Sequence, residues 1–413
     1  MFNWKRTIPK VSDLPAFGAP SPAIEDVLRI VPAAPPLPKT RGRTLRVTDT
    51  PSLFAAARDA KAGTTILLAD GLYPHVEELL IEQPGLTLRS ESGQRDRVIL
   101  DGDTKFTKMI RVRGARELTI ADITLRNCKQ YGIFMLGDSG LRDVLIHNCR
   151  FHNIWVRAVK GTKPNRIDDH GTNLMPMDEA LRLRPVGGRI QHCLFHNDTI
   201  KPFDDDGFDG DYVSGMDLMM LRDWTVSDNV FVGIRGKNGY GRGAIFIWVG
   251  SEKVVAERNV IVNCDRGICF GNPSGDRLHM TEGVVRNNLI MGGVNIAIEA
   301  GRTRQTSVCH NTIWCNAGRH AAIDFYQGAR DGRCLNNLIH NGRINCPKSM
   351  KQAGNVLGDL TGWFAGAPVG DFRLTELAAA ARGAGVPLPG VKEDFLRRPR
   401  PKRPTPGALE LAT

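Results

Sequence analysis

A short phrase that returns along the chain constrains this sequence more than any other feature. Asn229-Val-Phe-Val and Asn259-Val-Ile-Val each join a polar residue to a run of apolar ones, and the apolar segment 244–249 lies between them. Polar, apolar and turn-forming residues that return at a regular period are typical of a chain that winds repeatedly through one cross-section. The sequence therefore predicts a solenoid.

The phrase can be aligned at eight positions, which define the coils of the predicted solenoid. The copies begin at Asp122, Cys149, Cys193, Asn229, Asn259, Asn288, Asn311 and Asn337, with successive spacings of 27, 44, 36, 30, 29, 23 and 26 residues. Three short strands and three turns need about twenty residues or slightly more, so spacings of 23 to 30 fit one coil of an all-β, parallel β-helix. We expect the asparagines to stack into a ladder of hydrogen-bonded amides.

The two longest spacings indicate loops inserted between coils. Inserts are predicted at 157–185 and 198–221, and a smaller, glycine-rich excursion at 233–243. Long loops on three successive coils would lie side by side on one flank, where a solenoid places its functional surface.

The ends of the chain differ from the repeat. Residues 1–43 are proline-rich and read as an N-terminal arm, whereas 44–410 form the predicted β-helix domain. Thr50 as the N-cap, Pro51 and a stop at Gly63 predict a helix that caps the first coil. Residues 395–413 are a basic C-terminal tail, for which a solvated end is one interpretation.

Composition narrows the possible partners and the cellular location. The net charge of +11 favours an anionic polysaccharide, nucleic acid or membrane surface. Nucleic acid is disfavoured because basic residues do not interleave with aromatic ones, and no apolar run is long enough to span a membrane. No secretory signal stands in the sequence as written, which leaves a cytoplasmic protein or one whose leader is absent. Nine cysteines without a CxxC pair favour buried, reduced thiols over disulfides or zinc.

The segment 63–73, the eight phrases and the ending Gly407-Ala-Leu-Glu410 together resemble a known family. They are similar to right-handed parallel β-helix proteins related to polysaccharide lyases of the chondroitinase B and alginate lyase type, over about residues 45–410. The resemblance implies a single-stranded right-handed β-helix with an N-terminal helical cap, and lyase chemistry on an acidic, uronate-containing polysaccharide. It also implies a lysine and an arginine about one coil apart, near acidic residues that bind calcium. Lys160 and Arg182, with Arg184 as a neighbour, match those parts.

Elimination from a uronic acid requires three chemical roles. The substrate carboxylate must be neutralised, a base must remove the proton at C5, and an acid must assist the leaving oxygen. The candidates for these roles are, in that order, Arg182 and Arg184 or a calcium ion, Lys160 or His170, and Tyr240 or Arg242. No organic cofactor is expected.

An acidic cluster in the second insert is the candidate metal site. It contains Asp204, Asp205, Asp206, Asp209 and Asp211. Close carboxylates repel one another unless a cation lies among them, and oxygen ligands interspersed with glycine suit Ca²⁺, although the order differs from an EF-hand. A solvated or arginine-paired loop is the competing interpretation.

The glycine-rich excursion and the strand after it supply candidate substrate-binding residues. Arg235, Lys237 and Arg242 could hold an anionic chain near Tyr240, and Trp248 is either a sugar-stacking platform or a core residue. His152, His196 and His340 recur at one position of the phrase, which favours stacked ladder residues over metal ligands.

Other activities remain open at this point. Hydrolysis would use a pair of carboxylates drawn from Asp168, Asp169, Asp205 and Asp206. Return of the proton from the opposite face would make the protein a uronate epimerase, and a non-catalytic carbohydrate-binding or structural β-helix would use neither chemistry.

Overall fold

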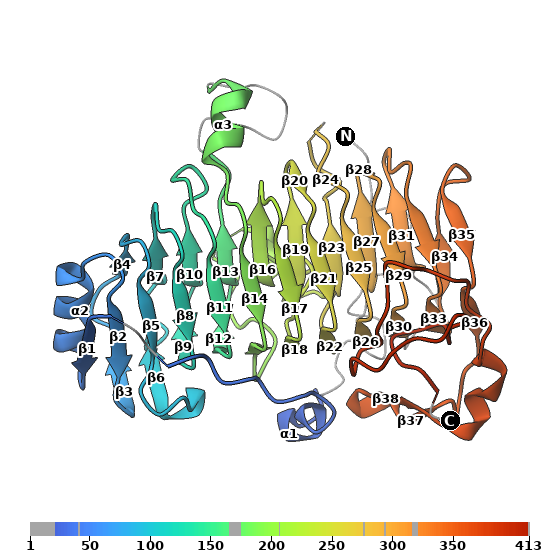
Figure 1. Cartoon of the computed structure of the whole chain (residues 1–413), viewed down its shortest axis with the longest axis horizontal. Helices are drawn as coiled ribbons and strands as arrows, with labels where there is room; N and C mark the ends of the chain where they lie inside the picture. Colours follow the sequence, from blue (N-terminus) through green and yellow to red (C-terminus); the bar gives the residue numbers. More distant parts are fainter. Residues whose placement is uncertain are drawn as a thin grey trace.

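The protein winds into a parallel β-helix of three long sheets (Figure 1). The computed structural model describes residues 21–39, 42–164, 175–205, 207–275, 277–292, 295–315 and 321–411. Within them the three sheets contain 12, 10 and 11 strands, and each coil adds one parallel strand to each sheet. The predicted fold class is confirmed.

Every sheet follows the order of the coils. The 12-stranded sheet contains β1 (Thr44–Val47), β2 (Thr65–Leu68), β5 (Thr87–Ser90), β8 (Thr119–Ala121), β11 (Leu145–His147), β14 (Arg189–Gln191), β17 (Thr225–Ser227), β21 (Val255–Glu257), β25 (Val284–Arg286), β29 (Ser307–Cys309), β32 (Arg333–Leu335) and β35 (Lys351–Ala353). The ten-stranded sheet contains β4 (Leu79–Ile81), β7 (Lys108–Val112), β10 (Tyr131–Met135), β13 (Arg157–Gly161), β16 (Ser214–Met219), β19 (Ile245–Trp248), β23 (Ile268–Phe270), β27 (Ile298–Gly301), β31 (Ala321–Tyr326) and β34 (Arg343–Asn345). The 11-stranded sheet contains β3 (Gly71–Pro74), β6 (Val98–Asp101), β9 (Thr124–Cys128), β12 (Arg150–Ile154), β15 (Leu194–His196), β18 (Val230–Val232), β22 (Val260–Val262), β26 (Leu289–Met291), β30 (Thr312–Trp314), β33 (Leu338–His340) and β36 (Val356–Gly358).

Short elements complete the described structure. A three-stranded sheet contains β20 (Ser251–Glu252), β24 (Met280–Thr281) and β28 (Thr303–Arg304), and β37 (Phe364–Gly366) pairs antiparallel with β38 (Asp371–Leu374). The helices are α1 (Ile24–Leu28), α2 (Thr50–Asp59), α3 (Met177–Leu183) and the 3-10 helices η3 (Arg95–Arg97), η4 (Phe208–Gly210), η5 (Ala367–Val369) and η6 (Glu376–Ala381). None of the helices in the described part of the chain is long and apolar enough to cross a membrane.

The asparagine ladder forms as predicted and extends one coil further. Side-chain amides donate to the next carbonyl oxygen at 2.9–3.0 Å from Asn229 through Asn337, and the chain of bonds ends at Asn355. Asp122 is not part of it, because Arg150 donates its backbone N–H to Ile123, which places Ile123 opposite Cys149. The expected alignment of the first phrase is therefore wrong by one residue.

The ladder should be a major source of stability. We expect Asn288→Ala to lower the free energy of unfolding by about 3 kcal/mol, because it leaves buried groups of Asn259 and Ala256 without partners. Urea denaturation measures the change. Asn272→Ala is the control, since that half-buried side chain accepts one bond from the Ser274 backbone N–H on the surface and its loss should cost about 0.5 kcal/mol or less. Equal losses for the two variants would contradict the role of the ladder.

Helix α2 covers the first coil as the predicted cap. It contacts β1, β2 and β4, and Leu53 is buried at the end of the core. The N-cap is Asp49, not Thr50. The Asp49 side chain accepts a hydrogen bond from the Ser52 backbone N–H at 2.8 Å, and the Asp49 backbone N–H donates to the Ser52 hydroxyl. This capping box satisfies two N–H groups and outweighs the single bond available from Thr50. The helix ends at Asp59, before the expected stop at Gly63.

The long loops do not share one flank, contrary to the expectation. The first insert connects β13 to β14 and thus leaves the ten-stranded sheet toward the 12-stranded sheet, and its described part carries α3 (Figure 1). The second ends at β16, and it and the glycine-rich excursion both enter the ten-stranded sheet from the opposite corner. The first insert therefore lies at one end of the strands of the ten-stranded sheet, and the other two loops lie at the opposite end.

The two ends of the chain lie against the other sheets. The N-terminal arm accepts hydrogen bonds at Pro35 and Pro38 from His147 and Arg89, and α1 buries Val27. Residues 386–411, here called the C-terminal strap, also pack on the β-helix instead of forming a solvated tail (Figure 1). Arg397, Arg398 and Arg400 form ion pairs with Asp228, Asp394 and Glu410.

All nine cysteines are free thiols within the described residues, seven of them buried. Cys149 and Cys193 continue the line of the asparagine ladder, where the Cys149 N–H approaches the Cys193 sulfur at 3.4 Å. Burial raises the pKa of Cys264 to about 12. The prediction of buried, reduced thiols is confirmed.

Candidate functional site

The outer face of the ten-stranded sheet carries a cluster of buried charged side chains beside the enlarged loops. Val159 and Met216 point into the core, so the next residues, Lys160 and Asp217, point outward on neighbouring strands. Lys160 was expected in a loop, but it lies in β13 directly opposite Asp217 of β16. The parallel register of two coils therefore brings these two side chains together.

Asp217 is the centre of this cluster. Its Oδ2 accepts hydrogen bonds from Lys160 Nζ at 2.6 Å and Arg157 Nε at 3.1 Å, and its Oδ1 accepts one from Trp248 Nε1 at 3.0 Å. The side chains of Asp217 and Lys160 are only 3% and 8% exposed. Burial acts to raise the pKa of Asp217, but Lys160 and Arg157 outweigh it and lower the pKa below its usual range. The cluster thus holds an ionised carboxylate between two cations.

Two tyrosines adjoin the cluster. The Arg157 guanidinium lies over the Tyr212 ring at 4.0 Å, and Tyr131 of β10 stands opposite Arg157 in the strand register. Burial raises the pKa of Tyr131 to about 12, and the nearby Tyr212 adds to the effect. Tyr131 therefore keeps its proton at neutral pH and is able to donate it.

The arginines expected beside Lys160 lie elsewhere. Arg182 is an exposed residue of α3 that pairs with Asp178, and Arg184 donates to Glu252 at 2.7 Å. The structure thus gives Lys160 a different arginine, Arg157, from its own strand. His170, Asp168, Asp169 and Asp206 fall outside the described residues.

The acidic loop is neutralised by lysines and amides within the described structure. Asp204 pairs with Lys237 at 2.5 Å and Asp205 with Lys129 at 2.6 Å. Asp211 accepts bonds from the backbone N–H and the side-chain amide of Asn238. Asp209 offers its backbone carbonyl to the same amide. These four aspartates do not converge on one point, so their arrangement does not fit a Ca²⁺ site, and calcium binding stays a prediction.

The glycine-rich excursion folds around a buried carboxylate. Asp265 accepts bonds from the N–H groups of Gly236 and Gly241 at 2.7 and 3.0 Å, and Arg235 lies 3.5 Å from it. Burial raises the pKa of Asp265 to about 6. Tyr240 donates its backbone N–H toward Asp211 at 3.3 Å. Arg235 and Tyr240 therefore stabilise the loop in this structure.

A second ion cluster lies three strands beyond Asp217 on the same sheet face. Glu299 accepts bonds from Arg242 at 3.2 Å and Arg266 at 2.9 Å, and Tyr326 also donates to it. Burial would raise the pKa of Glu299, but the two arginines lower it to about 2. Arg242 is thus held by Glu299 and not beside Lys160.

Trp248 points outward but offers no open ring face. Its ring stacks on Phe246 at 5.2 Å and packs with Met175 and Ala180 of the first insert, which leaves the residue 7% exposed. In this structure Trp248 orients Asp217 through its indole N–H.

The histidines of the repeated phrase stack as the ladder interpretation predicts. His152 and His196 lie in register with ring centroids 4.1 Å apart, and His340 stacks on Trp314 at 3.6 Å. Together with Asp198, the first two form the one group in the described structure that brings three potential metal ligands within reach of a single ion. Arg150 Nε already donates to His196 Nε2 at 2.9 Å, which opposes a cation there.

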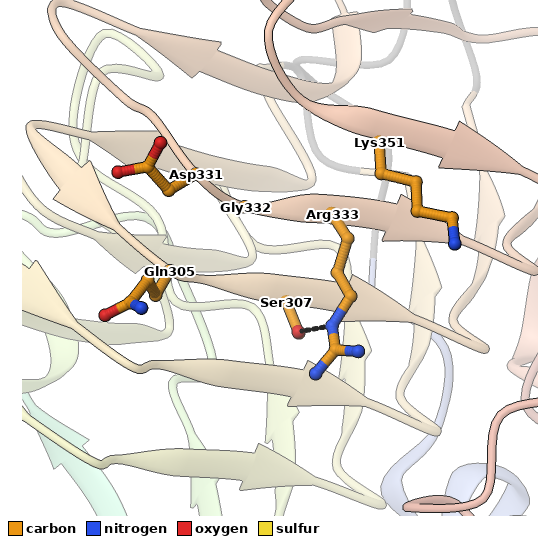
Figure 2. Close-up of a pocket in the computed structure, with 6 residues that line it drawn as sticks. All are labelled: Gln305, Ser307, Asp331, Gly332, Arg333 and Lys351. Atoms are coloured by element: carbon orange, nitrogen blue, oxygen red, sulfur yellow. Dashed lines mark hydrogen bonds between the residues drawn. The ribbon is translucent and has the colours of Figure 1, made fainter.

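A shallow groove of about 350 Å³ lies on the 12-stranded sheet, away from the Asp217 cluster (Figure 2). Figure 2 shows Arg333 reaching Ser307, to which its Nε donates at 2.6 Å, while Lys351 stands on the neighbouring strand. Its polar residues are mostly exposed, so solvent screens their charges. The Asp217 cluster is the stronger candidate site.

Four residues of this site were not predicted, namely Tyr131, Arg157, Tyr212 and Asp217. Two signals in the sequence could have identified the last. The segment 157–161 has the length of a strand, and Asp217 interrupts the otherwise apolar segment 216–221. A carboxylate within a buried strand calls for a cationic partner.

The comparisons with known proteins define the class of the fold. The family model for the right-handed beta helix region matches residues 108–358, more than half of the chain. The chain therefore belongs to the right-handed β-helix family, as the sequence resemblance implied. No curated protein matches the sequence.

Several solved structures share this architecture at low sequence identity. A pectate lyase, Pel9A, superposes with a TM-score of 0.57 at 11% identity, over 94% of this chain and 99% of the lyase. A polysaccharide lyase of family PL6 from Pseudopedobacter saltans gives 0.45 at 13% identity, over 88% and 99% of the two chains. The A-module of the Azotobacter vinelandii mannuronan C-5 epimerase AlgE6 gives 0.42 at 12%, over 75% and 93%. The likeness to Pel9A supports the β-helix fold over almost the whole chain.

Proposed function

We propose that this protein is a polysaccharide lyase that cleaves an acidic, uronate-containing polysaccharide by β-elimination at the Asp217 cluster. The observation that carries the proposal is a buried lysine and arginine sharing one carboxylate on a sheet face that enlarged loops flank. A pectate lyase has the same fold, and the net charge of +11 suits an anionic substrate.

Lys160 is the proposed base. A lysine accepts a proton only in its neutral form, so Lys160, which pairs with Asp217 as a cation in this structure, must first lose its proton to solvent. Asp217 then holds the Nζ atom in one position through the 2.6 Å bond. Arg157 is the proposed partner of the substrate carboxylate, because a guanidinium stabilises the negative charge that develops as the C5 proton leaves. It thus takes the role expected of Arg182 and Arg184.

Tyr131 is the proposed acid, in place of Tyr240 or Arg242, which have other partners. Burial raises its pKa to about 12, so the phenol is protonated in the resting site and gives its proton to the leaving alkoxide, which is the stronger base. The proton at C5 moves to Lys160, the C4–O bond breaks, a C4=C5 double bond forms, and the phenol proton passes to the departing oxygen. No step requires a metal ion.

Access to the cluster sets a condition on this proposal. Lys160 is 8% exposed and Arg157 is buried beside Tyr212. The sugar chain reaches them only if the loop that carries Tyr212, or the first insert, moves aside. Loops that close over a reacting sugar and exclude water are a common device in enzymes of this kind of chemistry.

Incubation with alginate, polygalacturonate and chondroitin sulfate tests the proposal. We expect one of these polymers to yield products with the ultraviolet absorbance of a conjugated C4=C5 double bond. New reducing ends without that absorbance would indicate hydrolysis, and a change in uronate configuration without cleavage would indicate epimerisation. Retention on a polymer gel without any product would leave a carbohydrate-binding protein, and each of these three results would overturn the lyase assignment.

A further inference from the structure

A strained turn stands at the mouth of the Asp217 cluster. Gly207, Phe208, Asp209 and Gly210 have φ values of 86°, 58°, 52° and 82°, four left-handed residues in succession. Glycine adopts this conformation freely, but a phenylalanine there is an outlier whose backbone energy must be offset by other contacts. Such strain concentrates at functional positions, so its purpose needs an explanation.

The glycine-rich excursion holds this turn in place. Lys237 donates its backbone N–H to the Gly210 carbonyl at 3.1 Å, and the Asn238 side chain donates to the Asp209 carbonyl at 2.7 Å. Asp211 binds Asn238 in return. The excursion is itself held by the fully buried Asp265, which accepts hydrogen bonds from the N–H groups of Gly236 and Gly241. The second insert and the glycine-rich excursion thus stabilise each other through hydrogen bonds.

The two loops leave the ring of Phe208 exposed to solvent. The residue is 73% exposed, although it is a large apolar side chain held in an unfavourable backbone conformation. Its ring stacks on Tyr212 with centroids 5.2 Å apart and an interplanar angle of 14°, and the Arg157 guanidinium lies over Tyr212. Phe208 is therefore connected to the candidate catalytic cluster through one ring.

Two of the carboxylates near Phe208 are paired with lysines. Asp204 and Asp205, which precede it, are neutralised by Lys237 and Lys129. Lys201 adds a positive charge close to the ring of Phe203. The side chain of Asp209, the residue after Phe208, is exposed, so a polyuronate that approaches the turn meets this carboxylate beside the two ion pairs.

From this arrangement we infer that Phe208 is a sugar-stacking residue, which binds a ring of the polysaccharide next to the ring that reacts at Lys160. The inference rests on the proposed function for the identity of the ligand. An exposed aromatic face binds the apolar C–H face of a sugar ring, and a pre-set backbone reduces the ordering that binding costs. The unfavourable backbone energy at Phe208 is the consequence of holding the ring in this position.

Binding measurements on three variants test the inference. Phe208→Ala should bind alginate or polygalacturonate about tenfold more weakly by affinity electrophoresis, Phe208→Trp should bind as the wild type does, and Phe208→Leu should resemble alanine. In cleavage assays the alanine variant should raise KM while kcat stays within about twofold. Leu377→Ala is the control, because Leu377 is 68% exposed on the distant η6 and should leave binding unchanged.

The outcomes separate the two proposals. Equal affinity of wild type, Phe208→Ala and Phe208→Leu overturns the stacking residue, even if cleavage of the polymer supports the lyase. Binding that depends on Phe208 without any cleavage supports the stacking residue and overturns the lyase. A wild-type protein that binds none of the polyuronates, or a Phe208→Trp variant that binds no better than Phe208→Leu, overturns the inference as well. Thermal melting should show no loss of stability in Phe208→Ala, since the side chain is exposed.

Discussion

Substitution of Lys160 by methionine is expected to lower kcat for polysaccharide cleavage by a factor of about 10² to 10⁴, the usual contribution of a general base. Methionine fills the space of the lysine stem but cannot accept the C5 proton. The appearance of the unsaturated product, followed by ultraviolet absorbance at saturating polymer, gives kcat directly. KM should change little, because Arg157 and Phe208 are left in place.

Lys160→Arg distinguishes a base from a structural cation. Arginine preserves a positive charge beside Asp217 but does not lose its proton in proteins, so this variant should be folded and as inactive as Lys160→Met. Lys351→Met, an exposed change on the 12-stranded sheet, should retain wild-type kcat. Substantial activity in Lys160→Arg would rule out Lys160 as the base and leave it a structural partner of Asp217.

Asp217→Ala is expected to be the most destabilising single change at the site. Removal of the carboxylate leaves Lys160 and Arg157 as two buried cations without a counter-charge, which costs about 3–5 kcal/mol in comparable buried pairs. The free energy of unfolding from urea titration measures the loss. The lowered pKa of Asp217 in the folded protein also makes the free energy of unfolding depend on pH. The stabilising charge of Asp217 is present above its unfolded pKa and is lost as the pH falls through the lower, folded value.

The matched control is Asp178→Ala. Asp178 also pairs with an arginine, Arg182, but both side chains are exposed on α3, so the change should cost about 1 kcal/mol or less. If Asp217→Ala proves no more destabilising than Asp178→Ala, then Lys160 and Arg157 are better solvated than their burial indicates, and the ion cluster does not hold the site together.

The fold could be predicted from the sequence because each coil repeats the same local chemistry. The side-chain amide of each asparagine at this corner donates to the asparagine of the next coil, so the spacing of Asn229, Asn259 and Asn288 reports the coil length directly. The prediction failed where this chemistry is missing. Ile123 occupies the ladder position in its coil, and the polar Asp122 beside it was aligned in its place.

The site was predicted only in part because its residues meet through strand register and not through sequence spacing. Lys160 was identified, but Asp217 lies 57 residues away, in a strand that the expected insert 198–221 concealed. Arg182 is closer to Lys160 along the chain, yet the first insert carries it out of the sheet on α3. Loop length indicated which three coils are enlarged, but not which corner each loop occupies.

The C-terminal strap should change how the β-helix unfolds. A stack of coils joined only to their neighbours can fray from an open end, one coil at a time. Here Arg397 binds Asp228, Gly390 accepts a bond from Arg286, and Val386 donates to Asn336, so one segment ties together coils that lie far apart in the stack. Loss of the last coils requires release of the strap from all of them. The C-terminal half should consequently unfold as one cooperative unit, with uniform hydrogen-exchange protection from β17 to β35.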